Sequence, residues 1–257
     1  MTDILYKFTS KAIKALSKHD IVSKPIDGFD KRLYYERSQH LTFLFQSKIS
    51  YEINIWNNIK ALLNEGDLIF DIGGNIGQYA LRFSEAVGTQ GKIITFEPDF
   101  KNFAFLQFNS NSNACKNIQC LNIGLGEKPE TIQFFRDTET GGRMGSFGKE
   151  FVQDKFKGFT DLVDVETYDR MVQKYGIPNF VKIDVEGFEF NVLKGVKDFS
   201  KDTKFLVEVR ESTKESVFEL FTQHHFDCFM VDDKASMKIN KKTEIPTFAN
   251  LLFIASK

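Results

Sequence analysis

The chain has 257 residues, 42% of them hydrophobic, which is enough for one sizeable core or for a single α/β domain with additions. Its 34 basic and 35 acidic residues leave a formal net charge of -1, so the chain has no net positive field to draw it onto nucleic acid, and we expect no nucleic-acid partner. The three cysteines form no CxxC pair, which argues against a zinc site or a disulfide scaffold and indicates a reducing compartment.

Residues 1–50 are predicted to form a helical extension in front of a domain that spans residues 51–257. Near its start, apolar residues share one helical face, and lysines line the edge of that face. The apolar residues are Ile4, Leu5, Phe8, Ala12, Ala15 and Leu16, and the lysines are Lys7, Lys11, Lys14 and Lys18. Such a helix either makes peripheral contact with an anionic membrane or packs against its own domain or a sister subunit of a homo-oligomer. We favour packing, because most amphipathic helices face a core.

No later stretch approaches the ~18 apolar residues of a membrane-spanning helix, and the N-terminus lacks the apolar region of a signal peptide. The sequence therefore predicts a cytoplasmic protein. After the extension, strand-like apolar runs alternate with helix-like segments, which is typical of βαβ units around a parallel sheet. The predicted strands are residues 67–72, 92–97, 117–123, 131–136, 161–167, 180–185, 204–209, 226–231 and 250–255.

The first predicted strand runs into a glycine-rich turn, "DIGGNIGQ", which carries Asp71, Gly73, Gly74, Asn75 and Gly77. It is neither the G-x-G-x-x-G dinucleotide fingerprint nor a phosphate-binding P-loop. An aspartate at the strand end suits the ammonium and sulfonium charges of S-adenosylmethionine, and the N-terminus of the next helix suits its methionine carboxylate. Taken alone, the motif leaves a cofactor site and a purely structural turn equally open.

Two further strand ends carry acidic residues. Glu97 in "ITFEPD" lies about twenty residues past the turn, where a carboxylate can accept both hydroxyls of a cofactor ribose, and Pro98 ends the strand behind it. In "VKIDVEG", Lys182, Asp184 and Glu186 are expected on one side of a strand, and Glu208 and Arg210 share a side one strand later. These charges indicate a site at the carboxyl edge of the sheet, although an ion pair of Arg210 with a carboxylate is the structural alternative.

These motifs resemble, in order, those of the FkbM-type S-adenosylmethionine-dependent methyltransferases, over residues 51–257. The matching segments are "YEINIWNNIKALLNEGDLIFDIGGNIGQYAL", "GKIITFEPDFKNFAFLQFN", "NIGLGE", "VETYDRM", "FVKIDVEGFEFNVLKG" and "FLVEV". The resemblance implies a class I methyltransferase (Rossmann-like) fold, with a seven-stranded, mostly parallel sheet, an antiparallel last strand and helices on both faces. It also implies O-methylation of a hydroxyl on a sugar, glycan or natural product, and an adenine pocket beside Ile123 and Gly124.

The sequence departs from the family at three positions. Gly74 and Gly124 stand where the family usually has alanine, and Arg210 stands where a histidine often follows "VEV". A guanidinium is always protonated, so the role of a histidine base is not transferred to Arg210. Asp184 is our first candidate for the base or for an anchor of the acceptor, with Glu186 and Glu208 next. A divalent metal held by these carboxylates is an alternative that we do not favour.

The segment 136–160 is rich in glycine, charge and aromatic residues and is long for a plain connection. It is either a lid or an ordinary surface loop, and as a lid it would bring Arg143 and Ser146 to the acceptor, alongside Arg210. Two other functions stay open: an NAD-dependent oxidoreductase on a Rossmann sheet, and a non-catalytic protein that keeps the cofactor pocket. The sequence does not identify the small-molecule or glycan acceptor.

Overall fold

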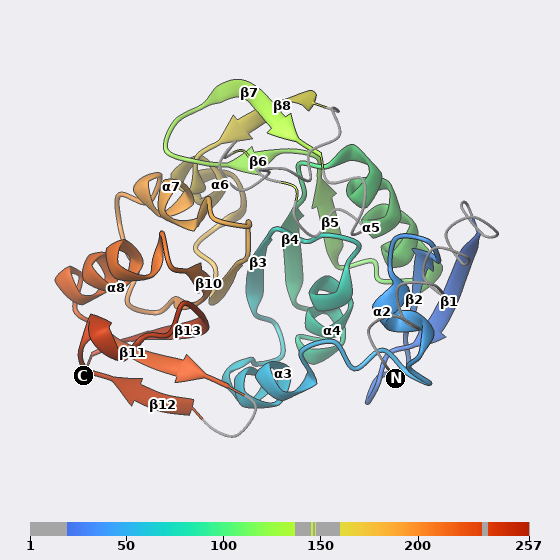
Figure 1. Cartoon of the computed structure of the whole chain (residues 1–257), viewed down its shortest axis with the longest axis horizontal. Coiled ribbons are helices and arrows are strands. Elements are labelled where there is room, and N and C mark those ends of the chain that lie inside the picture. Colours follow the sequence, from blue (N-terminus) through green and yellow to red (C-terminus); the bar gives the residue numbers. More distant parts are fainter. Residues whose placement is uncertain (1–19, 137–144, 146, 148–159, 233–235, 257) are drawn as a thin grey trace, which may run out of the picture.

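The computed structural model describes residues 20–136, 145, 147, 160–232 and 236–256. They form an α/β fold around an eight-stranded sheet, with the strand order β12-β11-β13-β10-β9-β3-β4-β5 (Figure 1). Five neighbouring strands are parallel: β10 (Lys204–Arg210), β9 (Phe180–Ile183), β3 (Leu68–Ile72), β4 (Lys92–Phe96) and β5 (Ile118–Leu121). This confirms the predicted fold class.

The last strand is antiparallel, as predicted, and lies inside the sheet. β13 (Phe248–Ala255) pairs with β10 on one side and with β11 (Phe226–Val231) on the other. β12 (Ser236–Ile239) then pairs antiparallel with β11 and forms the edge. The described residues thus give eight strands where the resemblance implied seven, because β12 adds to β11 by simple antiparallel pairing.

Side chains alternate between the two faces of the sheet. Ile69, Ile93 and Phe180 pack with α3 (Ile53–Ile59) and α4 (Gln78–Ala86), whereas their neighbours Phe70 and Ile94 face the other core. That second core is covered by α6 (Tyr168–Tyr175), α7 (Glu189–Lys194) and α8 (Lys214–Gln223). Helices therefore lie on both faces, which explains why the central strands are mostly apolar.

The N-terminal extension was predicted to be helical, and for residues 20–50 this is largely wrong. β1 (Ile21–Pro25) and β2 (Arg32–Glu36) form an antiparallel hairpin, and the single short helix α2 (Leu41–Leu44) follows it. The hairpin turn contains Gly28 at a φ of +79°. Along β2, Leu33 and Tyr35 are fully buried, and this two-residue period fits a strand rather than a helix. Residues 1–19, with the predicted amphipathic helix, lie outside the described residues.

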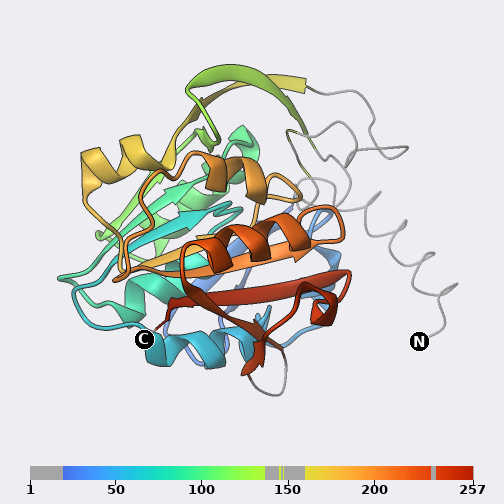
Figure 2. The same ribbon diagram turned by 90° about the vertical axis from the view of Figure 1, so that its left-hand side faces the viewer.

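A second small sheet consists of β6 (Gly124–Leu125), β8 (Thr160–Glu166) and β7 (Glu130–Phe135). β7 and β8 were predicted as strands, but they do not join the central sheet, and Figure 2 shows them arching above it. α5 (Phe100–Ser112) packs between β5 and β2, and two 3₁₀ turns lie at Lys60–Leu62 and Lys242–Glu244.

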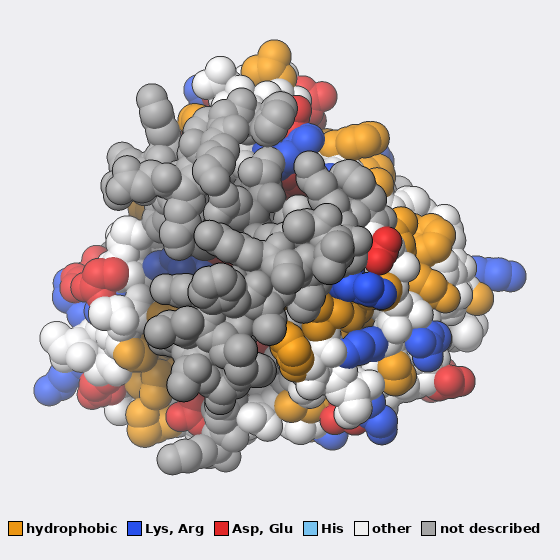
Figure 3. Space-filling view, turned by 45° about the vertical axis from the view of Figure 1, so that its right-hand side comes forward, with side chains coloured by type: hydrophobic (Ala, Val, Ile, Leu, Met, Phe, Trp, Pro, Cys, Tyr) orange, Lys and Arg blue, Asp and Glu red, His pale blue; other side chains and the backbone are white. Residues whose placement is uncertain are grey.

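Within the described ranges, no helix is long and apolar enough to cross a membrane. On the face in Figure 3, acidic, basic and hydrophobic side chains of the described residues are interspersed. The partner predictions and the division at residue 50 stay predictions.

Candidate functional site

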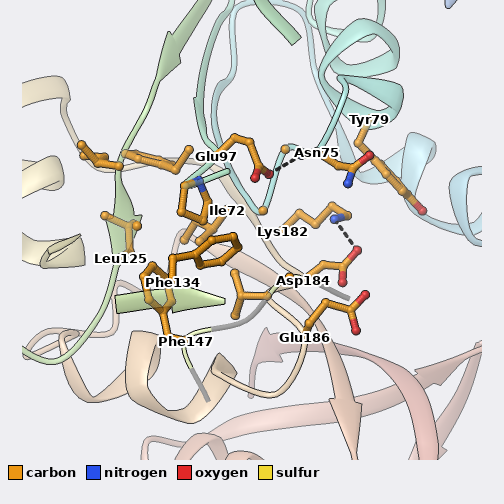
Figure 4. A pocket seen from close by; sticks show the side chains of 18 of the residues that line it. Ile72, Asn75, Tyr79, Glu97, Leu125, Phe134, Phe147, Lys182, Asp184 and Glu186 are labelled. Atoms are coloured by element: carbon orange, nitrogen blue, oxygen red, sulfur yellow. Dashed lines mark hydrogen bonds and ion pairs between the residues drawn. The ribbon is translucent and has the colours of Figure 1, made fainter. Parts of the chain in front are cut away.

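A pocket opens at the carboxyl ends of β3, β4 and β9 and encloses about 830 Å³, including its open mouth (Figure 4). Its wall contains most of the residues that the sequence suggested for a cofactor. They are Gly73, Gly74, Asn75, Glu97, Pro98, Ile123 and Gly124. The position agrees with the general rule that open α/β sheets bind ligands beyond the carboxyl ends of their strands.

The glycine turn approaches β9 so closely that side chains would not fit. A Cβ on Gly73, which has a φ of +86°, would lie 1.8 Å from the backbone oxygen of Asp184. The amides of Gly73 and Gly74 both donate to the carbonyl oxygen of Phe96, at 2.9 and 3.0 Å, and the amide of Asn75 donates to Glu97 Oε2 at 2.7 Å. The turn is thereby fixed to the end of β4, and these amides are already occupied within the chain. The helix N-terminus that the sequence suggested for the methionine carboxylate is that of α4, which begins at Gln78 after these amides.

Asp71 and Gly77, which the sequence also suggested for the cofactor, do not line the pocket. Asp71 is fully buried beneath the turn, where its Oδ2 accepts a hydrogen bond from Thr95 Oγ1 at 3.3 Å. Burial raises the pKa of Asp71, which Lys182 opposes. Gly77 begins α4 at a φ of +99°. Asp71 and Gly77 therefore support the conformation of the turn without lining the pocket.

Glu97 lies at the pocket wall with only 5% of its surface exposed. Its carboxylate accepts hydrogen bonds from the amides of Asn75, at 2.7 Å, and Asp99, at 2.9 Å. Burial raises the pKa of Glu97 to about 8, and the neighbouring charge of Asp99 adds to this effect. The two amide bonds and a hydrogen bond with the Asn102 side chain hold the carboxylate in place, and its remaining acceptor capacity is available for a ligand.

The other end of the pocket is apolar and is lined by Ile123, Leu125, Phe134 and Phe147. Phe134 and Phe147 meet edge to face, with ring centroids 5.0 Å apart. A Cβ on Gly124 would lie 2.6 Å from Cζ of Phe147, so the glycine leaves room for this ring. This gives a physical reason for glycine where the family usually has alanine.

We expect Gly124→Ala to displace the Phe147 ring and to destabilise the fold by about 1 kcal/mol through overpacking. In a Phe147→Leu background, the same substitution should cost clearly less, because a smaller side chain can yield. Denaturant unfolding of the parent, both single variants and the double variant measures this coupling. Strictly additive effects would show that Phe147 does not pack on Gly124.

The acidic residues of the two predicted strand ends converge. Carboxylate oxygens of Asp184, Glu186 and Glu208 all lie within 4.8 Å of one another. Lys182 Nζ donates to Asp184 Oδ2 at 2.9 Å, and Arg210 Nη2 donates to Glu208 Oε1 at 3.0 Å and also to Glu186. The ion pair that was the structural alternative for Arg210 is therefore present.

Burial and the neighbouring charges of the carboxylate cluster change the pKa of Glu208. Burial raises the pKa of Glu208 to about 9, with Asp184 and Glu186 adding to the effect and Arg210 opposing it. The spacing of the three carboxylates is one that a cation could bridge, but Arg210 already supplies positive charge there. A bound metal would have to displace that guanidinium, and so we continue not to favour one.

Several pocket residues were not among the predicted sites, notably Tyr51, Gln78, Tyr79 and Lys182. Glu52, at the start of α3, has a φ of 47° and accepts a hydrogen bond from the Tyr79 hydroxyl at 2.8 Å. The "YEINIW" segment was part of the family resemblance, but no local pattern in it shows which distant residues Glu52 contacts. Of the predicted acceptor contacts, Arg143 and Ser146 lie outside the described residues, and Arg210 lies in the carboxylate cluster.

Comparison with known proteins places the chain in a family. The model of the methyltransferase FkbM domain matches residues 71–234. The chain belongs to the FkbM methyltransferase family. Two curated relatives are the hexuronic acid methyltransferase AglP of Haloferax volcanii and Methyltransferase 1 of Beauveria bassiana. The first is 29% identical over 154 residues, covering 58% of this chain and 59% of the relative, and the second is 23% identical over 150 residues, covering 52% and 60%. The matches thus span about three fifths of these relatives.

Among solved structures, P. horikoshii TYW2 in complex with MeSAdo is similar in fold to this FkbM-family chain, with a TM-score of 0.51 and 11% sequence identity. The match covers 98% of this chain and 84% of that structure. Together with the strand order, this supports the class I methyltransferase fold.

Proposed function

We propose that the chain is an S-adenosylmethionine-dependent methyltransferase that methylates a hydroxyl of a sugar, glycan or natural product. The observation that carries this proposal is one continuous pocket. It joins the glycine turn and Glu97, which suit an adenosine, to the carboxylates Asp184 and Glu186, which suit a hydroxyl acceptor. The name of the hexuronic acid methyltransferase relative adds support for a sugar-type acceptor.

The residues present fit the cofactor. Gly73 and Gly74 bring backbone rather than side chains to the pocket wall, and Glu97 offers a carboxylate to the ribose. Asn75 Oδ1 is buried and has no hydrogen-bond partner among the described residues, so it can accept from a ligand. The apolar end with Leu125 and Phe134 suits an adenine ring.

When bound, the cofactor supplies a sulfonium methyl that is already a strong electrophile. The chain therefore has to orient an acceptor oxygen behind it and take the proton of that oxygen. Asp184, which lines the pocket, is our candidate for holding that proton at its carboxylate. Glu186 and Glu208 lie beside it and are the next candidates, while Arg210 keeps those two in place.

The experiment that tests the proposal is incubation with methyl-labelled S-adenosylmethionine and fractionated cell extract. We expect label in a glycan, lipid-linked sugar or small molecule bearing hydroxyls, as a base-stable ether. Label confined to protein or nucleic acid would contradict the proposed acceptor class. Binding of NAD in preference to S-adenosylmethionine by calorimetry would support the oxidoreductase alternative, and cofactor binding without any transfer would support a non-catalytic protein.

Cofactor affinity should depend on pH through Glu97. The pKa of Glu97 is about 8 in the folded protein, which is above the ordinary value of a glutamate. The protonated carboxyl therefore stabilises the fold at low pH, and this contribution to folding stability is lost as the pH rises through about 8. Ribose hydroxyls donate to the ionised form, and so affinity should rise with pH. We expect 5′-methylthioadenosine, which has no group titrating in this range, to bind at least ~10-fold more tightly at pH 9 than at pH 6. The same titration of Glu97→Gln should be flat, and a flat profile in the parent would contradict the assignment.

A further inference from the structure

Most of the charged side chains in the described pocket wall are acidic. Of the described residues that line it, the charged ones are Glu97, Asp184, Glu186 and Lys182. The carboxylates of Asp184 and Glu186 would repel any anionic group of a ligand, and Lys182 is the one cation of this described lining. S-Adenosylmethionine carries one anionic group, the carboxylate of its methionyl end. The charge pattern therefore offers that carboxylate a single favourable place.

Lys182 is held in a way that leaves hydrogen-bonding capacity unused. Its side chain is only 6% exposed, and its Nζ lies 4.8 Å from the centroid of the Tyr79 ring. Within the described part of the chain, Nζ makes one hydrogen bond, to Asp184 Oδ2 at 2.9 Å. An ammonium has three N–H donors, so two of them are free for an acceptor in the pocket (Figure 4).

The surroundings keep the ammonium charged. Burial alone would lower the pKa of Lys182, but Asp184, Asp71 and Glu52 raise it above its ordinary value. Glu52 is itself held by the Tyr79 hydroxyl, at 2.8 Å, and by Tyr51. These neighbouring carboxylates thus favour the charged form of Lys182, and the ion pair with Asp184 holds its ammonium.

The amides of the glycine turn, one alternative place for the carboxylate beside the N-terminus of α4, are largely taken. The amides of Gly73 and Gly74 bond to Phe96, that of Asn75 bonds to Glu97, and that of Gly77 bonds to the carbonyl oxygen of Gly74 at 2.9 Å. An anion at the turn would have to break several of these bonds. At Lys182 it would break none.

We propose that Lys182 binds the methionyl carboxylate of S-adenosylmethionine, in place of the amides of the glycine turn. This inference rests on the proposed function, because it assumes that cofactor. It makes Lys182 a cofactor-binding residue, with Asp184 and Glu52 holding its ammonium toward the pocket.

A matched pair of ligands tests this without an acceptor. Decarboxylated S-adenosylmethionine keeps the adenosine, sulfonium and ammonium and lacks only the carboxylate. By calorimetry, we expect the parent chain to bind it ~10- to 100-fold more weakly than S-adenosylmethionine, the range for a charge-assisted hydrogen bond. Equal affinities would overturn the inference alone, whereas a parent that binds neither ligand would overturn the proposed function as well.

The same ligand pair with variants assigns the effect to the residue. In Lys182→Gln the two ligands should bind within ~3-fold of each other, while Lys182→Arg, which keeps the charge, should retain the preference. Lys92→Gln is the matched control, because Lys92 is exposed at the amino end of β4, and it should behave like the parent. Melting temperatures are recorded alongside, since Lys182→Gln leaves Asp184 without its ion-pair partner. If Lys182→Gln does not fold, Lys182→Met, which fills the same buried space without a charge, takes its place, and a parental ratio in either folded variant would refute the assignment.

Discussion

Asp184→Asn should lower the rate of methyl transfer by roughly 10²- to 10⁴-fold, the usual range for loss of a general base. The substitution keeps the shape of the side chain and removes the negative charge. Asparagine can still accept a hydrogen bond from Lys182 Nζ, which lies 2.9 Å from Oδ2 of the parent aspartate. We therefore expect cofactor affinity to change by less than ~3-fold, so that the effect is on the chemical step. Single-turnover rates and calorimetric affinities measure the two separately.

The Lys182 ion pair defines the opposing interpretation. If Asp184 serves only to neutralise that buried ammonium, Asp184→Asn should lower the melting temperature while turnover per folded molecule persists. Asp198→Asn, at an exposed position outside the pocket lining, is the matched control for loss of one carboxylate. A chelator added to the parent protein tests the metal alternative. If methyl transfer persists in its presence, Asp184 acts as a base or an anchor without a bound ion.

Glu97→Ala should weaken S-adenosylmethionine binding about 30-fold or more, which corresponds to roughly 2 to 3 kcal/mol for charged hydrogen bonds to the ribose. The carboxylate also accepts the amides of Asn75 and Asp99, so the variant should lose some order in the glycine turn as well. Calorimetry gives the affinity, and the melting temperature reports the structural part.

A ligand without ribose hydroxyls separates these two effects. The parent should bind 2′,3′-dideoxyadenosine more weakly than adenosine, whereas Glu97→Ala should bind both with similar affinity. A Glu97→Ala protein that keeps the parental preference for adenosine would show that the ribose lies elsewhere, whatever the variant does to stability.

The central strands could be predicted because their signal is local. The apolar runs that give β3, β4 and β9 are bounded by turns. Both faces of these strands are buried, so the runs can be recognised in the sequence without knowing where the helices pack. The convergence of the glycine turn, Glu97 and Asp184 follows from the topology, because parallel strands bring their carboxyl ends to one edge.

The remaining features depend on contacts between distant parts of the chain. Nothing near Glu52 in the sequence indicates that it meets Tyr79. The strand period does place Lys182 on one side with Asp184, but no local pattern shows that Lys182 is the one cation of the described pocket lining. The hairpin β1–β2 was missed because the helical period of residues 4–18 was extended over the whole N-terminal segment. The eighth strand was missed because a strand such as β12, with most of its residues exposed, lacks an apolar run.

The position of β13 has a consequence for how the protein is made. Residues 248–255 leave the ribosome after β10 and β11, yet they pair with both of those strands in the interior of the sheet. Until they emerge, both of those strands present open edges, which are sites for pairing with other chains. The nascent chain is therefore exposed to aggregation until residues 248–255 emerge, and a premature stop codon before residue 248 would leave β10 and β11 without the strand that joins them.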